Sequence, residues 1–81
     1  MSEKHIHVEV AAPKGEFKAT FPETKTVGDV IAAVVDKQQL PSGDKYELVY
    51  KGESLAPTAT LASLHLPEHV SFVLVATGSG V

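Results

Sequence analysis

The chain has 81 residues, enough for one domain, and 43% of them are hydrophobic, which argues against disorder over most of its length. Ten acidic residues against seven lysines give a formal charge of −3, and there is no arginine, so we expect neither nucleic-acid nor membrane-surface binding. The absence of cysteine excludes disulfides, thiolate metal sites and cysteine nucleophiles.

Residues 1–10 contain charged residues and alternate polar with apolar side chains, unlike a signal peptide. No apolar run approaches the ~20 residues of a membrane span. We therefore predict a cytoplasmic protein that binds no cofactor and is a monomer.

The first two elements are predicted to be strands. Residues 5–11 alternate β-branched apolar side chains with polar ones, and residues 17–21 alternate phenylalanine and alanine with lysine and threonine. A short segment with Pro13 and Gly15 separates them, which favours an antiparallel hairpin. Pro22 is expected to end the second strand.

The next segment changes to helical spacing. Thr26 is suited to be an N-cap, with Asp29 three residues on completing an approximate capping box. Apolar residues then recur at three- and four-residue intervals and share one face: Val27, Val30, Ile31, Val34 and Val35. The many β-branched residues and Gly28 lower helix propensity, so a strand is the competing interpretation. The sequence Leu40-Pro41 predicts the stop.

Residues 46–64 are predicted to form short elements: a strand over 46–50, a turn at 51–53, a brief extended segment at 54–55 and a helical turn over 60–64. The final strand, 70–75, is almost entirely apolar. Such a strand is usually central and covered on both faces; the alternative is that one face is an exposed binding surface.

This order predicts an α+β fold: a mixed sheet of four to five strands with one main helix packed on one face, in a grasp-like topology. We place the domain at residues 1–76. Residues 77–81 contain two glycines and small polar side chains, which predicts a flexible tail.

Several pieces resemble the ubiquitin family, in one order along the chain. Residues 36–41 are similar to the end of that family's helix and its proline stop, and residues 48–55 to a strand, glycine turn and leucine. Thr26 is similar to the N-cap threonine, and Thr60-Leu61 to the opening of the short second helical element. The resemblance implies a ubiquitin-like β-grasp fold.

The resemblance also implies a protein modifier that is not an enzyme. A peptidase would remove Val81, and the carboxylate of Gly80 would be activated and joined to target amines by activating and conjugating enzymes; Gly78 is the second candidate terminus. The chain departs from ubiquitin here, since its glycines are separated by Ser79 and no arginine precedes them. Glu53 also replaces ubiquitin's main linkage lysine. These departures point to a divergent relative, of bacterial type.

A partner-binding patch is predicted on the outer face of the sheet. If the side chains of residues 70, 72 and 74 face the core, alternation turns Val73 and Val75 outward, together with Val49 on the neighbouring strand. The resemblance implies the same three positions, with Val73 in place of the family's histidine. The alternative is that a loop or the tail covers them.

The remaining polar residues give weaker signals. Lys14, Lys37 and Lys51 are possible acceptors for chain formation, or ordinary solubilising charges. His5 and His7 share a strand face, but two ligands do not make a structural metal site, so we predict solvated histidines and no metal. No nucleophile motif is present.

Two other functions compete with the modifier. A β-grasp adaptor would use the patch without any covalent step. A sulfur carrier would hold a thiocarboxylate on its terminal glycine.

Overall fold

The computed structural model describes residues 4–12, 14–40 and 45–78. In this part of the chain lie five strands, one α-helix and one turn of 3₁₀-helix. Their bounds are β1 His5–Ala12, β2 Gly15–Pro22, α1 Val27–Gln38, β3 Lys45–Tyr50, β4 Glu53–Leu55, η1 Ala62–Leu64 and β5 His69–Gly78. The predicted α+β class and the single main helix are confirmed.

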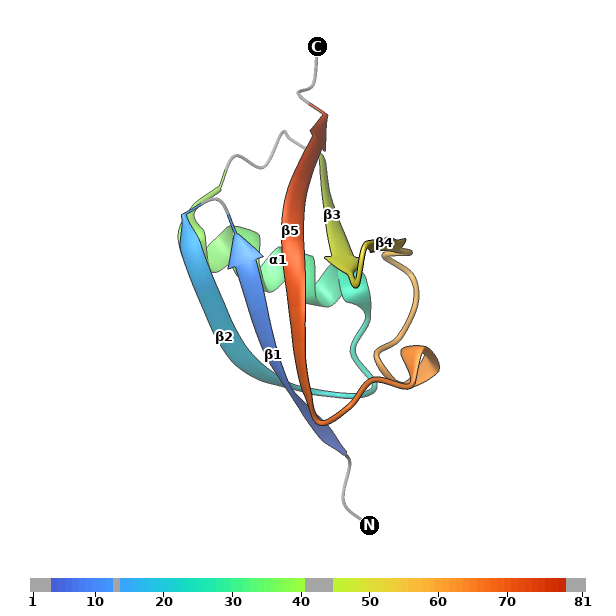
Figure 1. The fold of residues 1–81 in the computed structure, drawn as a ribbon. Helices are drawn as coiled ribbons and strands as arrows, with labels where there is room; N and C mark the ends of the chain where they lie inside the picture. Colours follow the sequence, from blue (N-terminus) through green and yellow to red (C-terminus); the bar gives the residue numbers. More distant parts are fainter. Residues whose placement is uncertain (1–3, 13, 41–44, 79–81) are drawn as a thin grey trace.

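The strands form one mixed sheet in the order β2-β1-β5-β3-β4. The first and last strands of the chain, β1 and β5, pair in parallel at its centre, and the other neighbours are antiparallel. Helix α1 crosses one face of this sheet (Figure 1). The opposite face carries no helix of the described chain, so β5 is central but is covered on one side.

The capping residues predicted for α1 are present. The hydroxyl of Thr26 accepts the backbone N–H of Asp29 at 3.1 Å, and the Asp29 carboxylate accepts the N–H of Thr26 at 3.0 Å. This reciprocal pair satisfies two backbone groups that the helix leaves unbonded. The helical interpretation of this segment is therefore confirmed over the strand.

The weak helix sequence is supported by the loop that follows β4. The N–H of Val27 donates to the carbonyl of Ala59 at 2.8 Å, and the N–H of Gly28 donates to the carbonyl of Pro57 at 2.9 Å. A Cβ atom on Gly28 would lie 3.1 Å from that Pro57 oxygen. Glycine thus lets the loop come close enough to satisfy the first helical N–H groups.

The helix ends at Gln38 and is closed by Gln39, which adopts the left-handed conformation at φ 56°. Leu40 then donates its N–H to the carbonyl of Val35 at 3.0 Å and is buried. The stop thus comes from a left-handed C-cap and a buried leucine; Pro41 lies outside the described residues.

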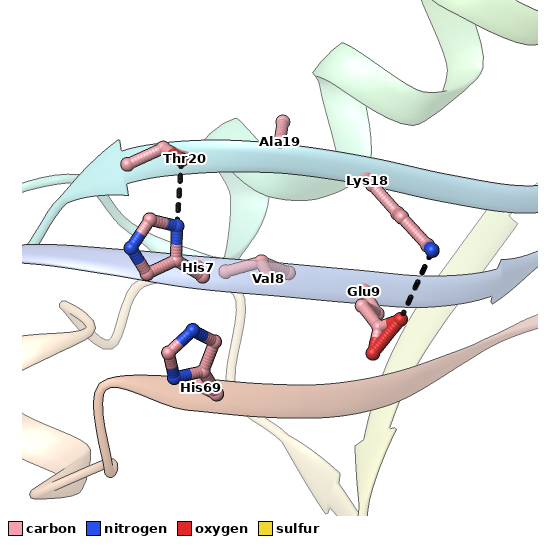
Figure 2. Close-up of a pocket in the computed structure, with 7 residues that line it drawn as sticks. All are labelled: His7, Val8, Glu9, Lys18, Ala19, Thr20 and His69. Carbon is pink, nitrogen blue, oxygen red and sulfur yellow. Dashed lines mark hydrogen bonds and ion pairs between the residues drawn. The ribbon is translucent and has the colours of Figure 1, made fainter.

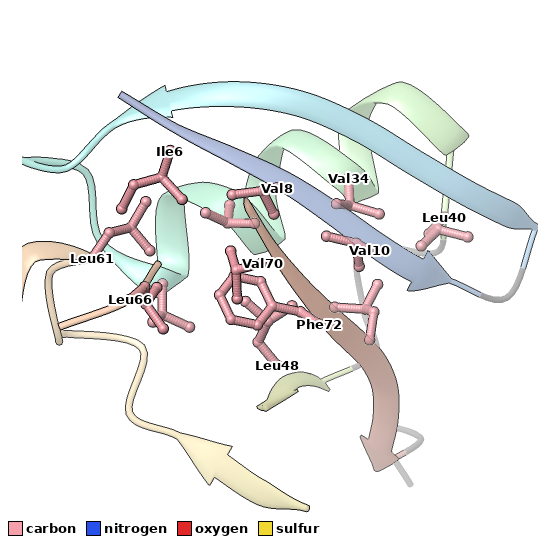
Figure 3. Close-up of a cluster of buried hydrophobic side chains, with 13 residues drawn as sticks. Ile6, Val8, Val10, Val34, Leu40, Leu48, Leu61, Leu66, Val70 and Phe72 are labelled. Carbon is pink, nitrogen blue, oxygen red and sulfur yellow. The ribbon is translucent and has the colours of Figure 1, made fainter. Parts of the chain in front are cut away.

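The core fills the space between α1 and the sheet (Figure 3). Within the described residues it contains no polar side chain. Its buried members are Ile6, Val8, Val10, Val27, Val30, Val34, Leu40, Leu48, Leu61, Leu66, Val70, Phe72 and Leu74. Burying one such side chain contributes roughly 1.5–3 kcal/mol, so this cluster dominates the stability of a chain this small.

No helix in the described ranges is both long and apolar enough to cross a membrane.

Candidate functional site

The outer face of the sheet, opposite α1, carries the exposed apolar side chains. Val73 is 47% exposed and Val75 is 40% exposed, whereas Phe72 and Leu74 between and beside them are buried. Strand alternation is the cause, because successive side chains of β5 point to opposite faces. One central strand therefore supplies both the core and an exposed apolar surface.

Val73 and Val75 are joined by Val49 from β3, and we call these three residues the valine patch. Val49 is the cross-strand partner of Val73 and is half-buried. On the other side Val73 is paired with Ala11 of β1, which is exposed. The structure thus brings together the three valines named from the sequence, and no described segment covers them.

The edge of the valine patch is acidic. Val75 is the partner of Glu47 on β3, and the Glu47 carboxylate accepts the hydroxyl of Ser54 on β4 at 2.9 Å. This bond holds the carboxylate against the sheet. A partner that covers the patch therefore meets valine side chains beside a negative charge, which suits an apolar surface edged by lysine or arginine.

The C-terminal end of β5 is paired with β3 but not with β1. Its pairing with β1 runs as far as Val73, while its pairing with β3 continues to Gly78 opposite Lys45. The hydroxyl of Thr77 donates to the carbonyl of Lys45 at 3.4 Å. Figure 1 shows the strand reaching past the end of β1. Strand β5 thus includes two residues of the predicted tail; Gly80 lies outside the described residues.

The three lysines named as acceptors are all exposed and lie at separate places. Lys14 is in the turn between β1 and β2, and Lys37 is in the last turn of α1. Lys51 follows β3 with φ 51°, and its ammonium lies 5.5 Å from the centre of the Tyr50 ring. Each is accessible to solvent, and nothing in their geometry distinguishes one from the others.

A second polar feature of the outer face was not identified from the sequence. His7 lies beside His69 of β5, its partner in the parallel ladder, and their rings stack with centroids 4.6 Å apart and planes 15° apart. Thr20 of β2 bonds to Nδ1 of His7 at 3.1 Å. The rings line a shallow depression of about 440 Å³ (Figure 2). Only the parallel pairing of two distant strands brings them together.

Charged groups elsewhere on this face form ordinary surface pairs. Lys18 lies 3.7 Å from Glu9 and 3.6 Å from Glu16, and all three are largely solvated, so the pairs add little stability. The pKa of Asp29 is lowered because its carboxylate accepts the N–H of Thr26. That shift belongs to the helix cap and not to a reactive site.

Comparison with known proteins gives a structural match without a sequence match. No protein-family model and no curated protein sequence matches the chain. Among solved structures, a ubiquitin from Caldiarchaeum subterraneum is 29% identical, with a TM-score of 0.80, over 95% of this chain and 99% of that one. At this identity the sequence has diverged while the fold has been kept.

Two further solved structures show the same fold at lower identity. One, described as molecular mimicry of SUMO that promotes DNA repair, has a TM-score of 0.82 at 21% identity, over 93% of this chain and 95% of that one. The other is the ubiquitin-like domain of the Arabidopsis thaliana protein At2g32350, with a TM-score of 0.76 at 24% identity, over 93% of this chain and 80% of that one.

Proposed function

Because the chain is a divergent ubiquitin-like β-grasp protein, we propose that it is a protein modifier, attached through a C-terminal glycine to amines of target proteins. Gly80 becomes the terminus when a peptidase hydrolyses the bond to Val81; Gly78 is the alternative terminus. The partners are a processing peptidase, an activating enzyme, a conjugating enzyme and the targets. The chain itself contributes no catalytic group.

The covalent steps need only ATP, partner thiols and a target amine. The Gly80 carboxylate attacks the α-phosphate of ATP, which forms an acyl adenylate and releases pyrophosphate. A cysteine thiolate of the activating enzyme displaces AMP to give a thioester, which passes to a thiol of the conjugating enzyme. A lysine amine then attacks the thioester carbonyl, forms the isopeptide bond and releases the thiol.

The observation that supports this proposal is that the strand bearing two of the patch valines leads directly into the glycine-containing end of the sequence. Strand β5 presents Val73 and Val75 on the outer face and then runs past the end of β1 to Gly78. Gly80 is the fifth residue after Val75 in the sequence, at most about 17 Å of extended chain. An enzyme bound at the valine patch can therefore reach the terminus it must activate.

The glycines themselves suit the activation step. Glycine has no side chain, so a segment ending in glycine passes through a narrow groove that would exclude larger residues. Ser79, which lies between them, also has a small side chain. The lack of arginine before this segment means that an activating enzyme would rely on apolar contacts with the patch more than on charge.

A non-conjugated adaptor is the second candidate, and the exposed valine patch favours it. The patch is formed by β3 and β5 alone and needs no free terminus. A sulfur carrier, in contrast, needs the terminal glycine but forms no adduct with other proteins. The three functions therefore differ in the covalent state of the chain.

The test is the intact mass and an immunoblot of an N-terminally tagged chain purified from its native cells. A modifier gives a species that has lost Val81, together with a ladder of larger covalent adducts that resist reducing agents. A terminal exchange of oxygen for sulfur without adducts would indicate the carrier. A full-length, unmodified chain under all conditions would reject the modifier and leave the adaptor.

Matched variants assign the terminus. Deletion of residues 78–81 should abolish the ladder, and deletion of Val81 alone should keep it, because the second chain already ends in Gly80. Gly80→Glu should abolish the ladder, since a large charged side chain cannot enter a narrow groove. If Gly80→Glu retains the ladder and Gly78→Glu loses it, the terminus is Gly78.

A further inference from the structure

The histidine pair on the outer face combines metal-binding groups from two strands that are far apart in the sequence. His7 and His69 are exposed and directly paired between parallel β1 and β5. Their ring centroids are 4.6 Å apart. We propose that the two imidazoles form a surface site for a borderline divalent transition-metal ion, such as Zn²⁺ or Ni²⁺, with water completing the coordination.

The separation of the rings suits a shared ion. Metal–nitrogen bonds to histidine are about 2.0–2.1 Å long, so two nitrogens on one ion lie about 3–3.5 Å apart. In the stacked arrangement the nitrogen lone pairs lie in nearly parallel planes. With His7 held by Thr20, rotation of the His69 ring about χ2, which is broad for histidine, turns its nitrogen toward the same point. Neither ring is in the core, so the rotation disturbs no packing.

Thr20 provides the partner that orients one ligand. Its hydroxyl lies 3.1 Å from Nδ1 of His7, and a hydroxyl can accept as well as donate a hydrogen bond. When Nδ1–H donates to Thr20, the other ring nitrogen, Nε2, carries the free lone pair. Metal-bound histidines commonly use such a bond to fix the ring and its tautomer. Thr20 is therefore a positioning residue for His7.

The surroundings of the two rings leave space for an ion, and the nearby charged side chains offset one another. The rings line the depression of about 440 Å³ on the outer face, which is open to solvent (Figure 2). Lys18 lies on the same face, but its ammonium is within 4 Å of the carboxylates of Glu9 and Glu16, which offset its charge. The described residues form no group of three or more ligands, so the ion would be exchangeable and not structural.

This site differs from the pair suggested by the sequence. His5 and His7 share a face of β1, but they are two residues apart along one strand, about 6.6 Å. His7 and His69 face each other across the ladder. Affinity should follow the usual order for nitrogen sites, with Ni²⁺ and Zn²⁺ well above Mn²⁺.

The experiment is a titration of the tag-free chain with Zn²⁺ and with Ni²⁺, followed by calorimetry and by the histidine ring signals in NMR spectra. We expect one ion per chain and shifts confined to the signals of His7 and His69. His7→Gln and His69→Gln should each weaken binding at least tenfold. His5→Gln is the matched control and should change the dissociation constant by less than twofold.

Thr20 supplies a second arm of the test. Thr20→Val should weaken binding severalfold, while Thr20→Ser should restore it because the hydroxyl is kept. All five variants lie at strand positions outside the core, and urea unfolding of each confirms that it folds. No binding at millimolar Zn²⁺ would overturn the proposal. It would also fail if His5→Gln weakened binding as much as His7→Gln while His69→Gln had no effect.

Discussion

The two faces of the sheet are built by the same strands, yet their side chains differ in burial. On the inner face, Phe72 and Leu74 are buried against α1 and the rest of the core. On the outer face, Val73 and Val75 of the same strand keep 40% or more of their surface exposed. Residues one step apart in the sequence therefore have opposite roles. The inner face determines stability, and the outer face is free to serve recognition.

The largest expected effect is on the inner face. Phe72→Ala removes a fully buried ring that meets Tyr50 edge-on, with centroids 5.6 Å apart. It should cost about 3–5 kcal/mol in the free energy of unfolding, measured by urea denaturation. Val73→Ala, the neighbouring exposed position, should cost less than about 1 kcal/mol.

A milder substitution at Phe72 keeps the comparison measurable if Phe72→Ala does not fold. A domain of this size has roughly 5–10 kcal/mol of stability, so Phe72→Ala can leave little folded protein. Phe72→Leu keeps most of the volume and should cost about 1 kcal/mol. Equal losses at Val73 and Phe72 would show that the outer face is also packed, against a partner or a second copy of the chain.

The next effect should appear on the outer face in binding and not in folding. Val73→Asp places a charge in the middle of the valine patch, beside Val49 and near Glu47. Conjugate formation in the native cells should fall at least tenfold, about 1.4 kcal/mol of recognition energy, while the unfolding midpoint changes little.

Ser71→Asp is the matched control for that variant. Ser71 is exposed on the same face of β5, two residues from Val73, and lies outside the patch. The amount of adduct that it forms should remain within twofold of the amount formed by the unaltered chain. An equal loss in both variants would indicate a general charge effect and would count against the patch as the recognition surface.

A smaller effect is expected at the cap that positions the inner-face helix. Thr26→Ala removes the hydroxyl that accepts the Asp29 N–H. The loss should be about 1 kcal/mol in chemical denaturation. Thr26→Ser should keep most of the stability, and Thr58→Ala, at an exposed loop position, should have almost no effect. A negligible loss at Thr26 would mean that core packing alone holds α1.

The smallest effect concerns pH. The pKa of Asp29 is lowered by the hydrogen bond from the Thr26 N–H, with further help from the Thr26 side chain and Lys25. A lowered pKa means that this carboxylate stabilises the fold above the ordinary value of 3.8 and that the contribution is lost as pH falls through the folded-state pKa. Asp29→Asn should therefore flatten the fall in stability below about pH 4.

The control for the pH series is Asp36→Asn, which changes the same residue type in the last turn of the same helix. Its side chain is exposed and takes no part in the N-terminal cap. The acid limb of its stability curve should follow that of the unaltered chain. If Asp29→Asn and the unaltered chain lose stability in parallel, the cap does not contribute to acid sensitivity.

Much of the fold follows from local sequence. The alternation in β1 and β2, the Thr26–Asp29 capping pair and the three- and four-residue spacing of the helix each require only neighbouring residues. These signals predicted the N-cap of the helix, its apolar face and the alternation along β1 and β2. They are local because backbone hydrogen bonds and side-chain direction repeat with fixed periods.

Some packing details could not be predicted in this way. Gln38 is a polar residue at the end of the helix, yet it is half-buried and its amide donates to the carbonyl of Gly15 at 3.0 Å. Gly28 lowered helix propensity, yet it allows the approach of Pro57. Both contacts join segments more than twenty residues apart, and no local period reports them.

The sequence by itself determined the class of fold, the helix and the alternating strands, because these depend on spacing along the chain. Only the tertiary structure decided the parallel pairing of the first strand with the last and the register between distant strands. The parallel pairing of β1 with β5 placed His7 against His69, and the pairing of β3 with β5 placed Val49 against Val73. The reason is physical: a sheet ladder is a contact between distant segments, so its register is set by how the whole core packs and not by the residues of either strand alone.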